Sequence, residues 1–174
     1  VPGSGRARWG WYRLADHVAL ALVGQSGVGP GALVLDLGAG DGAITRHLVA
    51  TGARTIAFEL HAVRAAQLRQ RFAADALKVV QADIADLRLP TRGFQVVANP
   101  PFGVVSPVLR RLTHRHSRLV RADLVVPGVV ASRWSALLQG SAWRMNFGQR
   151  VPRGAFTPRP TIDCCIVTIT RTPD

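Results

Sequence analysis

Residues 33–42 read L-V-L-D-L-G-A-G-D-G, a short apolar run that ends in an aspartate and three alternating glycines. A run of aliphatic residues this short is typical of a strand that is buried on both faces of a sheet. Glycines directly after such a strand let the backbone adopt positive φ and approach a ligand closely. The stretch therefore predicts a strand, a tight turn and the start of a helix, with Asp36 and the turn beside a ligand.

Strands and helices alternate along the rest of the chain. This order predicts an α/β fold, in which a mostly parallel sheet of seven strands carries helices on both faces. Residues 1–10 are predicted to be a flexible basic arm, and residues 11–174 a single domain. The predicted strands are Leu33–Leu37, Arg54–Phe58, Leu77–Gln81, Phe94–Ala98, Leu119–Val126, Trp143–Val151 and Thr161–Thr170. The predicted helices are 13–24, Ala43–Ala50, His61–Ala74, Val105–Thr113 and Val129–Gln139.

The composition narrows the class of protein. The chain has 174 residues, of which 48% are hydrophobic, enough for one well-packed core. No run approaches the roughly 20 apolar residues that a membrane span needs. Cys164 and Cys165 are the only cysteines, and neighbours on a strand point to opposite faces, so a structural disulfide is not expected. Two reduced cysteines are typical of a reducing compartment, and we expect a cytoplasmic protein.

The charge suggests a partner. The formal net charge is +12, and Lys78 is the only lysine among the 22 basic residues. Arginine binds phosphate with two donors and stacks on bases, so a strongly basic domain favours nucleic acid. An anionic membrane surface is the main alternative, and a GC-rich genome would account for part of the arginine content.

Acidic residues follow each of the first three predicted strands. Asp36, Glu59 and Asp83 lie at these three strand ends. In an open parallel sheet the carboxyl ends of the strands meet at one edge, where ligands bind. An acid after the second strand can accept two hydrogen bonds from a ribose diol. The pattern indicates a nucleotide-like cofactor.

Two cofactors of this kind are possible. A dinucleotide usually needs G-x-G-x-x-G, which leaves a helix N-terminus open for its pyrophosphate. Here the spacing is G-x-G-x-G, and Asp41 stands where the pyrophosphate would approach. S-adenosylmethionine has a ribose and an adenine, carries ammonium and sulfonium charges, and has no phosphate. Three acids at successive strand ends therefore favour S-adenosylmethionine over NAD.

Residues 97–102 read V-A-N-P-P-F, and they end the fourth strand sharply. Two prolines cannot donate hydrogen bonds to a sheet, so Asn99 and Phe102 lie on a stiff loop. The Asn99 side-chain oxygen and the Pro100 carbonyl can accept the hydrogens of a planar amino group and direct its lone pair. Phe102 can stack on a base. This chemistry requires no metal ion, and we predict none.

These motifs resemble the class I S-adenosylmethionine-dependent methyltransferases, and N-P-P-F resembles the [DNS]-P-P-[YF] motif of enzymes that methylate planar nitrogen. The resemblance implies a Rossmann-like fold. It implies that the turn containing Gly38, Ala39 and Gly40 approaches the methionine moiety. It further implies that Glu59 holds the ribose and Asp83 the adenine amino group. Leu60, Ile84 and Asn99 complete the implied cofactor-binding set.

The stretch R-V-P-R-G-A-F-T-P-R-P-T-I-D-C-C-I-V, residues 150–167, resembles the F-x-P-x-P-x-V-D-S segment of Erm-type rRNA adenine N6-methyltransferases. In that family the counterpart of Phe156 lines the target-base pocket. W-Y-R-L, residues 11–14, stands where the family has Gln-Asn/His-Phe-Leu, and by position Tyr12 and Leu14 line the cofactor. The resemblance ends near residue 170, which implies a short form without the family's small helical C-terminal domain.

The resemblance implies methylation of adenine N6 in 23S rRNA by a monomer, with resistance to macrolide-type antibiotics. Two alternatives remain open. The family usually has N-[IL]-P-[YF], and the N-P-P-F of this chain is closer to enzymes that act on DNA adenine or a protein side chain. The other alternative is a non-catalytic RNA-binding or assembly factor.

Overall fold

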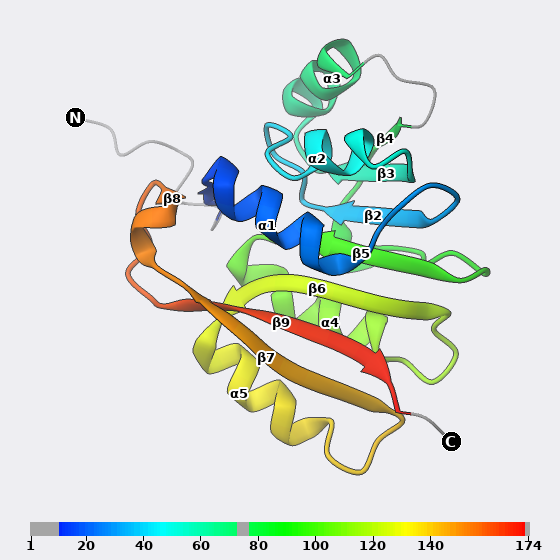
Figure 1. Ribbon diagram of the computed structural model, residues 1–174, viewed down its shortest axis with the longest axis vertical. Helices are drawn as coiled ribbons and strands as arrows, with labels where there is room; N and C mark the ends of the chain where they lie inside the picture. Colours follow the sequence, from blue (N-terminus) through cyan, green and yellow to red (C-terminus); the bar gives the residue numbers. More distant parts are fainter. Residues whose placement is uncertain (1–10, 73–76, 173–174) are drawn as a thin grey trace.

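The centre of the molecule is a seven-stranded sheet. The computed structural model describes residues 11–72 and 77–172. The strands of the sheet are β2 (Leu33–Leu37), β3 (Arg54–Glu59), β4 (Leu77–Gln81), β5 (Phe94–Ala98), β6 (Leu119–Pro127), β7 (Trp143–Val151) and β9 (Cys164–Arg171). Their order is β4-β3-β2-β5-β6-β9-β7, and β9 runs antiparallel to both of its neighbours, β6 and β7, whereas the other pairs are parallel (Figure 1). The predicted α/β fold with a mostly parallel sheet is confirmed.

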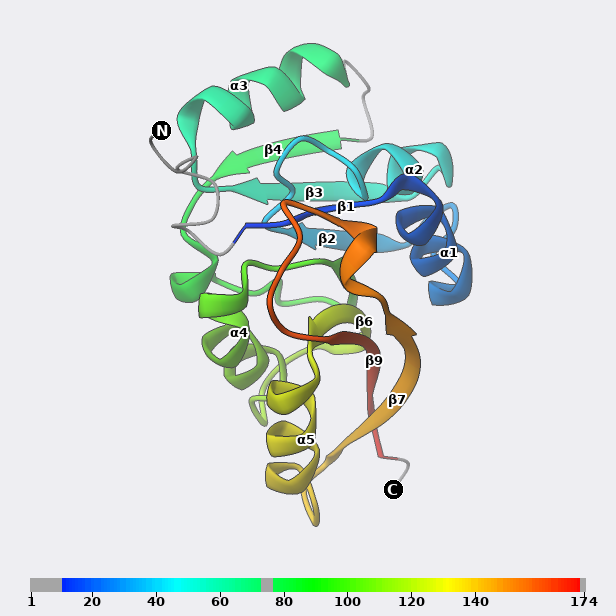
Figure 2. The same ribbon diagram turned by 90° about the vertical axis from the view of Figure 1, so that its left-hand side faces the viewer.

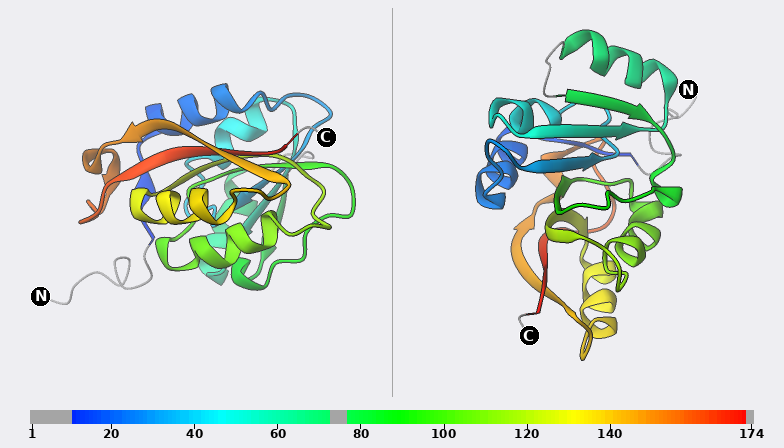
Figure 3. Two further views of the ribbon diagram at one scale, coloured as in Figure 1. Left: turned by 90° about the horizontal axis from the view of Figure 1, so that it is seen from below. Right: turned by 90° about the vertical axis from the view of Figure 1, so that its right-hand side faces the viewer.

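Helices cover both faces of the sheet. They are α1 (Asp16–Ser26), α2 (Thr45–Ala50), α3 (Ala62–Arg71), α4 (Val105–Leu112) and α5 (Gly128–Leu137). The left view of Figure 3 shows α1 on one side of the sheet and α4 and α5 on the other. Val34 of β2 packs in the core with α1, and its neighbour Leu35 packs in the core with α4, because successive side chains of a strand point to opposite faces. Among the described helices, none is long and apolar enough to cross a membrane.

A second, two-stranded sheet lies at the carboxyl edge and was not predicted. β1 (Arg13–Leu14) pairs antiparallel with β8 (Phe156–Thr157), with Leu14 opposite Phe156. The predicted helix from residue 13 therefore begins only at Asp16, after the backbone N–H of Ala15 has bonded the carbonyl of Ala155 at 2.7 Å. This pairing brings residues 11–14 beside the segment around Phe156.

Other predicted boundaries move by a few residues. The last strand begins at Cys164 rather than Thr161, because Pro158 and Pro160 hold the preceding segment in a loop. The predicted end of helix His61–Ala74 and the predicted flexible arm at residues 1–10 lie outside the described residues. The single domain over 11–174 stays a prediction.

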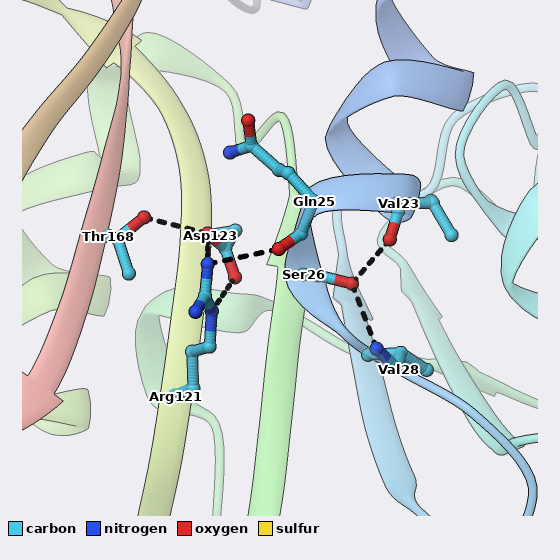
Figure 4. Close-up of polar contacts among 7 residues, drawn as sticks. All are labelled: Val23, Gln25, Ser26, Val28, Arg121, Asp123 and Thr168. Carbon is cyan, nitrogen blue, oxygen red and sulfur yellow. Dashed lines mark hydrogen bonds and ion pairs between the residues drawn. The ribbon is translucent and has the colours of Figure 1, made fainter.

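A buried ionic network fixes α1 to the sheet. The Asp123 carboxylate on β6 is completely buried and accepts two hydrogen bonds from Arg121, at 2.7 and 2.9 Å (Figure 4). The Thr168 hydroxyl on β9 donates a third hydrogen bond to it at 2.7 Å. Arg121 also donates to the carbonyl of Gln25 near the end of α1, at 3.2 Å. The network therefore connects β6, β9 and α1.

Candidate cofactor and catalytic site

The carboxyl ends of the parallel strands meet at one edge of the sheet, and Figure 2 shows β3 and β4 pointing toward this edge at the left. Glu59 is the last residue of β3 and its side chain is 3% exposed. Its carboxylate accepts hydrogen bonds from the backbone N–H groups of Gly40, at 2.8 Å, and His61, at 2.9 Å. Each oxygen keeps a second lone pair. The carboxylate is therefore held rigidly as a double acceptor.

A cavity of about 210 Å³ opens beside this carboxylate. Asp83 lies at its rim, with Oδ1 accepting the backbone N–H of Ala85 at 2.8 Å, so that the position of its other oxygen is fixed. Ile84 is buried, whereas Leu60 is half-exposed. The structure thus brings five of the predicted cofactor residues, Gly38, Glu59, Leu60, Asp83 and Ile84, to one cavity. Its lining is Trp11, Gly38, Glu59, Leu60, His61, Arg64, Ala82, Asp83, Ile84, Pro101 and Val104.

A second cavity, of about 20 Å³, lies next to the first, and Gly38 and Trp11 line both. Gly38 has φ of 81°, and a Cβ added there would lie 2.7 Å from Cδ of Pro101. The glycine turn can therefore approach the N-P-P-F loop only because Gly38 has no side chain. The predicted cofactor residues that line this small cavity are Tyr12, Leu14, Asp36, Gly38, Ala39 and Asn99.

Asp36 is buried at the bottom of the small cavity. Its Oδ2 accepts a hydrogen bond from the Thr45 hydroxyl at 2.6 Å. Burial raises the pKa of Asp36 to about 7, against the lowering effect of the Thr45 hydrogen bond, and the charge of Glu59 raises it further. The Arg13–Asp41 ion pair also lines this cavity and carries no net charge. A cationic ligand group here would favour the ionised form of Asp36.

The raised pKa of Asp36 predicts a stability that depends on pH. Between its ordinary pKa of 3.8 and about 7, the folded chain keeps a proton on Asp36 that the unfolded chain has released. The free energy of unfolding should therefore fall as pH rises through this window, by about 4 kcal/mol from this group. Urea unfolding at several pH values measures the slope. Asp36→Asn should flatten this slope, whereas Asp86→Asn, which changes an exposed carboxylate, should leave the slope unchanged. Equal slopes in the wild-type chain and both variants would contradict the prediction.

Asn99 stands directly after β5 and is held by the N-terminal segment. Its Nδ2 donates a hydrogen bond to the backbone carbonyl of Tyr12 at 2.7 Å. Its Oδ1 is buried and has no hydrogen-bond partner among the residues that the structure describes. Leaving a buried acceptor unpaired costs roughly 1–3 kcal/mol, so such a group needs an explanation. Among the described residues, Oδ1 is therefore an acceptor that a ligand could still pair with.

Aromatic rings gather beside Asn99. The ring of Phe102 lies 4.6 Å from that of Tyr12, centroid to centroid. Phe156 packs edge-on at 6.3 Å from Phe102 and 6.5 Å from Tyr12, and is itself buried. Two of these rings were predicted to meet the target base, whereas Tyr12 was predicted only as a cofactor residue. Pro100 is buried between Asn99 and the loop.

Sequence reasoning missed two side chains of the site, Trp11 and Arg64. Gly40, which was predicted to meet the cofactor, lines neither cavity because the Trp11 indole lies over it. Arg64 on α3 approaches Glu59 to 4.0 Å and also lies over the Trp11 ring. The only signal of Trp11 in the sequence is that W-Y-R-L replaces the expected amide residues.

Comparison with known proteins identifies the family of the chain. A family described as "Methyltransferase domain" matches residues 34–123. The chain is 33% identical to an rRNA adenine N-6-methyltransferase of Corynebacterium diphtheriae, over 99% of this chain and 71% of the relative. It is 35% identical to the mycinamicin-resistance protein MyrB of Micromonospora griseorubida, over 79% of this chain but only 46% of that protein.

Among solved structures, the 23S rRNA methyltransferase ErmE superposes with a TM-score of 0.82 at 22% identity, covering 92% of this chain and 70% of ErmE. At that identity the likeness shows the fold. The match to the Corynebacterium relative, together with the family match, shows the family. The chain is an S-adenosylmethionine-dependent methyltransferase, and it belongs to the Erm-type rRNA adenine N6-methyltransferases.

Proposed function

We propose that the chain transfers a methyl group from S-adenosylmethionine to the N6 amino group of an adenine in 23S rRNA. The observation that carries the proposal is the buried Oδ1 of Asn99, which has no partner among the described residues. Asn99 lines the smaller cavity, and its Nδ2 is bonded to the backbone of Tyr12, whose ring belongs to the aromatic cluster. An exocyclic amino group offers the hydrogen that this oxygen lacks, on a flat ring that an aromatic side chain can stack against.

The residues present fit the cofactor. The two oxygens of Glu59 would accept the ribose hydroxyls, and the second oxygen of Asp83 the adenine amino group. Leu60 and Ile84 would enclose the adenine, with Gly38, Ala39 and Asp36 facing the methionine part. The cofactor supplies a methyl carbon bonded to a cationic sulfur.

The chain's part in the transfer is to orient and to stabilise charge. Asn99 Oδ1 and the Pro100 carbonyl would accept the two N6 hydrogens, which turns the nitrogen lone pair toward the methyl carbon. As the nitrogen took the methyl carbon from the sulfur, positive charge would grow on the nitrogen, and these two acceptors would stabilise it. Phe102 would stack on the base, and the buried Phe156 supports Phe102 from the side. The surplus proton leaves N6 to water.

The substrate assignment rests on relatives and on charge. MyrB is named for mycinamicin resistance, and ErmE is a 23S rRNA methyltransferase by its title. A net charge of +12 suits an RNA partner. From these we infer a monomer that acts on 23S rRNA in the cytoplasm and gives resistance to macrolide-type antibiotics.

Label transfer tests the proposal. The chain is incubated with methyl-labelled S-adenosylmethionine and, separately, protein-free 23S rRNA, 16S rRNA, duplex DNA and a protein extract. We expect label in 23S rRNA, recovered as N6-methylated adenine after digestion. Label only in 16S rRNA would overturn the 23S assignment. Label only in DNA or protein, or none while the cofactor binds by calorimetry, would overturn the RNA assignment as a whole.

A further inference from the structure

Trp11 lies at the junction of the two cavities of the site. It lines the larger cavity with Glu59 and Asp83, and the smaller one with Asp36 and Asn99. Its side chain is 8% exposed. A ligand that reaches from Asp83 past Glu59 to Asp36 has to pass this indole.

Two neighbours fix the position of the ring. A Cβ added to Gly40 would lie 2.3 Å from Nε1 of Trp11, so the indole rests directly on the glycine turn. The guanidinium of Arg64 lies over the ring, 4.2 Å from its centroid, and its Nη1 is 4.0 Å from Oε1 of Glu59. A cation over an indole face is attracted to it by about 0.5–2 kcal/mol, depending on its hydration. Trp11 is thus packed between the turn and α3, next to the carboxylate that would hold the ribose.

We propose that Trp11 is a cofactor-binding residue. Its indole would form the wall of the site between the ribose and the methionine part of the cofactor, and it covers the glycine turn, which would otherwise be exposed to the cofactor. The inference rests on the assignment of S-adenosylmethionine as cofactor. It also accounts for the fact that Gly40 lines neither cavity, since Trp11 covers it.

The position of Trp11 also connects the cofactor site to the catalytic amide. Trp11 is followed directly by Tyr12, whose carbonyl holds Nδ2 of Asn99. The same short segment contacts the cofactor cavity through Trp11 and the aromatic cluster through Tyr12.

Tryptophan fluorescence tests the proposal with S-adenosylhomocysteine, which binds without reacting. The chain has four tryptophans, so the titrations use a Trp9→Phe background. Trp143 is a matched control, because it is also buried and lies under an arginine, with Arg171 Cζ 4.7 Å from its ring centroid, but it lines neither cavity. In the Trp9→Phe background, we expect the tryptophan emission to change when S-adenosylhomocysteine is added. Adding Trp11→Phe should abolish this change, whereas adding Trp143→Phe should leave the change as it was.

Calorimetry on the same variants gives the affinity. Trp11→Ala should raise the dissociation constant of S-adenosylhomocysteine by about tenfold or more, in line with about 1.4 kcal/mol for each factor of ten. Trp11→Phe, which keeps an aromatic ring, should raise it less, and Trp143→Phe should not raise it. A full emission change in Trp11→Phe, or an unchanged affinity in Trp11→Ala, would overturn the role of Trp11. No binding to the wild-type chain would instead overturn the cofactor assignment itself.

Discussion

Asn99→Ala is expected to lower the rate of methyl transfer to 23S rRNA by about 10²- to 10³-fold, the usual cost of removing one oriented group that stabilises a charged transition state. The reason is the geometry of Oδ1, which is buried, unpaired within the described residues, and aimed by the hydrogen bond from Nδ2 to the Tyr12 carbonyl. In the proposed arrangement this oxygen accepts from the reacting nitrogen, and Asn99 is only one of the residues that line the small cavity. Cofactor affinity should therefore change by less than about threefold.

Single-turnover labelling of RNA measures the rate, and calorimetry with S-adenosylhomocysteine measures the affinity. Asn146→Ala is the matched control, because Asn146 is exposed on β7 and lines neither cavity. It should leave both quantities unchanged. If Asn99→Ala retains the wild-type rate, the proposed role of the amide oxygen is wrong. A parallel loss of cofactor affinity would instead indicate that the amide mainly organises the small cavity.

Arg121→Ala is expected to reduce the free energy of unfolding by about 3 kcal/mol, at the lower end of the range for breaking a buried ion pair, because the Arg121 side chain is 33% exposed. The carboxylate of Asp123 is completely buried, and two of its three hydrogen bonds come from Arg121 (Figure 4). In the variant, the Asp123 carboxylate keeps only the hydrogen bond from the Thr168 hydroxyl, and the carbonyl of Gln25 loses its hydrogen bond from Arg121. For a chain of this length the midpoint of thermal unfolding should fall by about 10 °C.

Thermal and urea unfolding followed by circular dichroism measure this effect. Arg144→Ala, at an exposed arginine on β7, should cost less than about 0.5 kcal/mol. Adding Asp123→Asn to Arg121→Ala should recover part of the loss, because an uncharged amide costs less to bury than a carboxylate. A loss in Arg121→Ala no larger than that in Arg144→Ala would show that the ion pair contributes little to stability.

Much of the site could be predicted because its residues follow strands. Once residues 33–37 and the next two strands are recognised, parallel pairing brings Asp36, Glu59 and Asp83 to one edge, since βαβ units bring every parallel strand back in the same direction. The stiff N-P-P-F loop could be predicted equally well, because two prolines restrict the backbone wherever they occur. The three acids and Asn99 line the two adjoining cavities as this argument requires.

The N-terminal segment could not be predicted in the same way. β1 pairs with β8, which lies near the other end of the chain, and the pairing involves only two residue pairs. So short a pairing leaves no hydrophobic periodicity in the sequence from which it could be predicted. The helix expected from residue 13 starts three residues later for this reason. The raised pKa of Asp36 likewise depends on burial and on the distances to Thr45 and Glu59, which no sequence pattern contains.

The sequence by itself determined the α/β sheet, the edge at which the site lies, and the identity of the acids, the amide and the glycines, because strand alternation, proline and glycine act locally. Only the tertiary structure decided that Trp11 covers Gly40, that Tyr12 stacks with Phe102, and that Asn99 presents an unpaired oxygen. These contacts join side chains that lie far apart in the sequence, and they are set by close packing in three dimensions rather than by any local pattern.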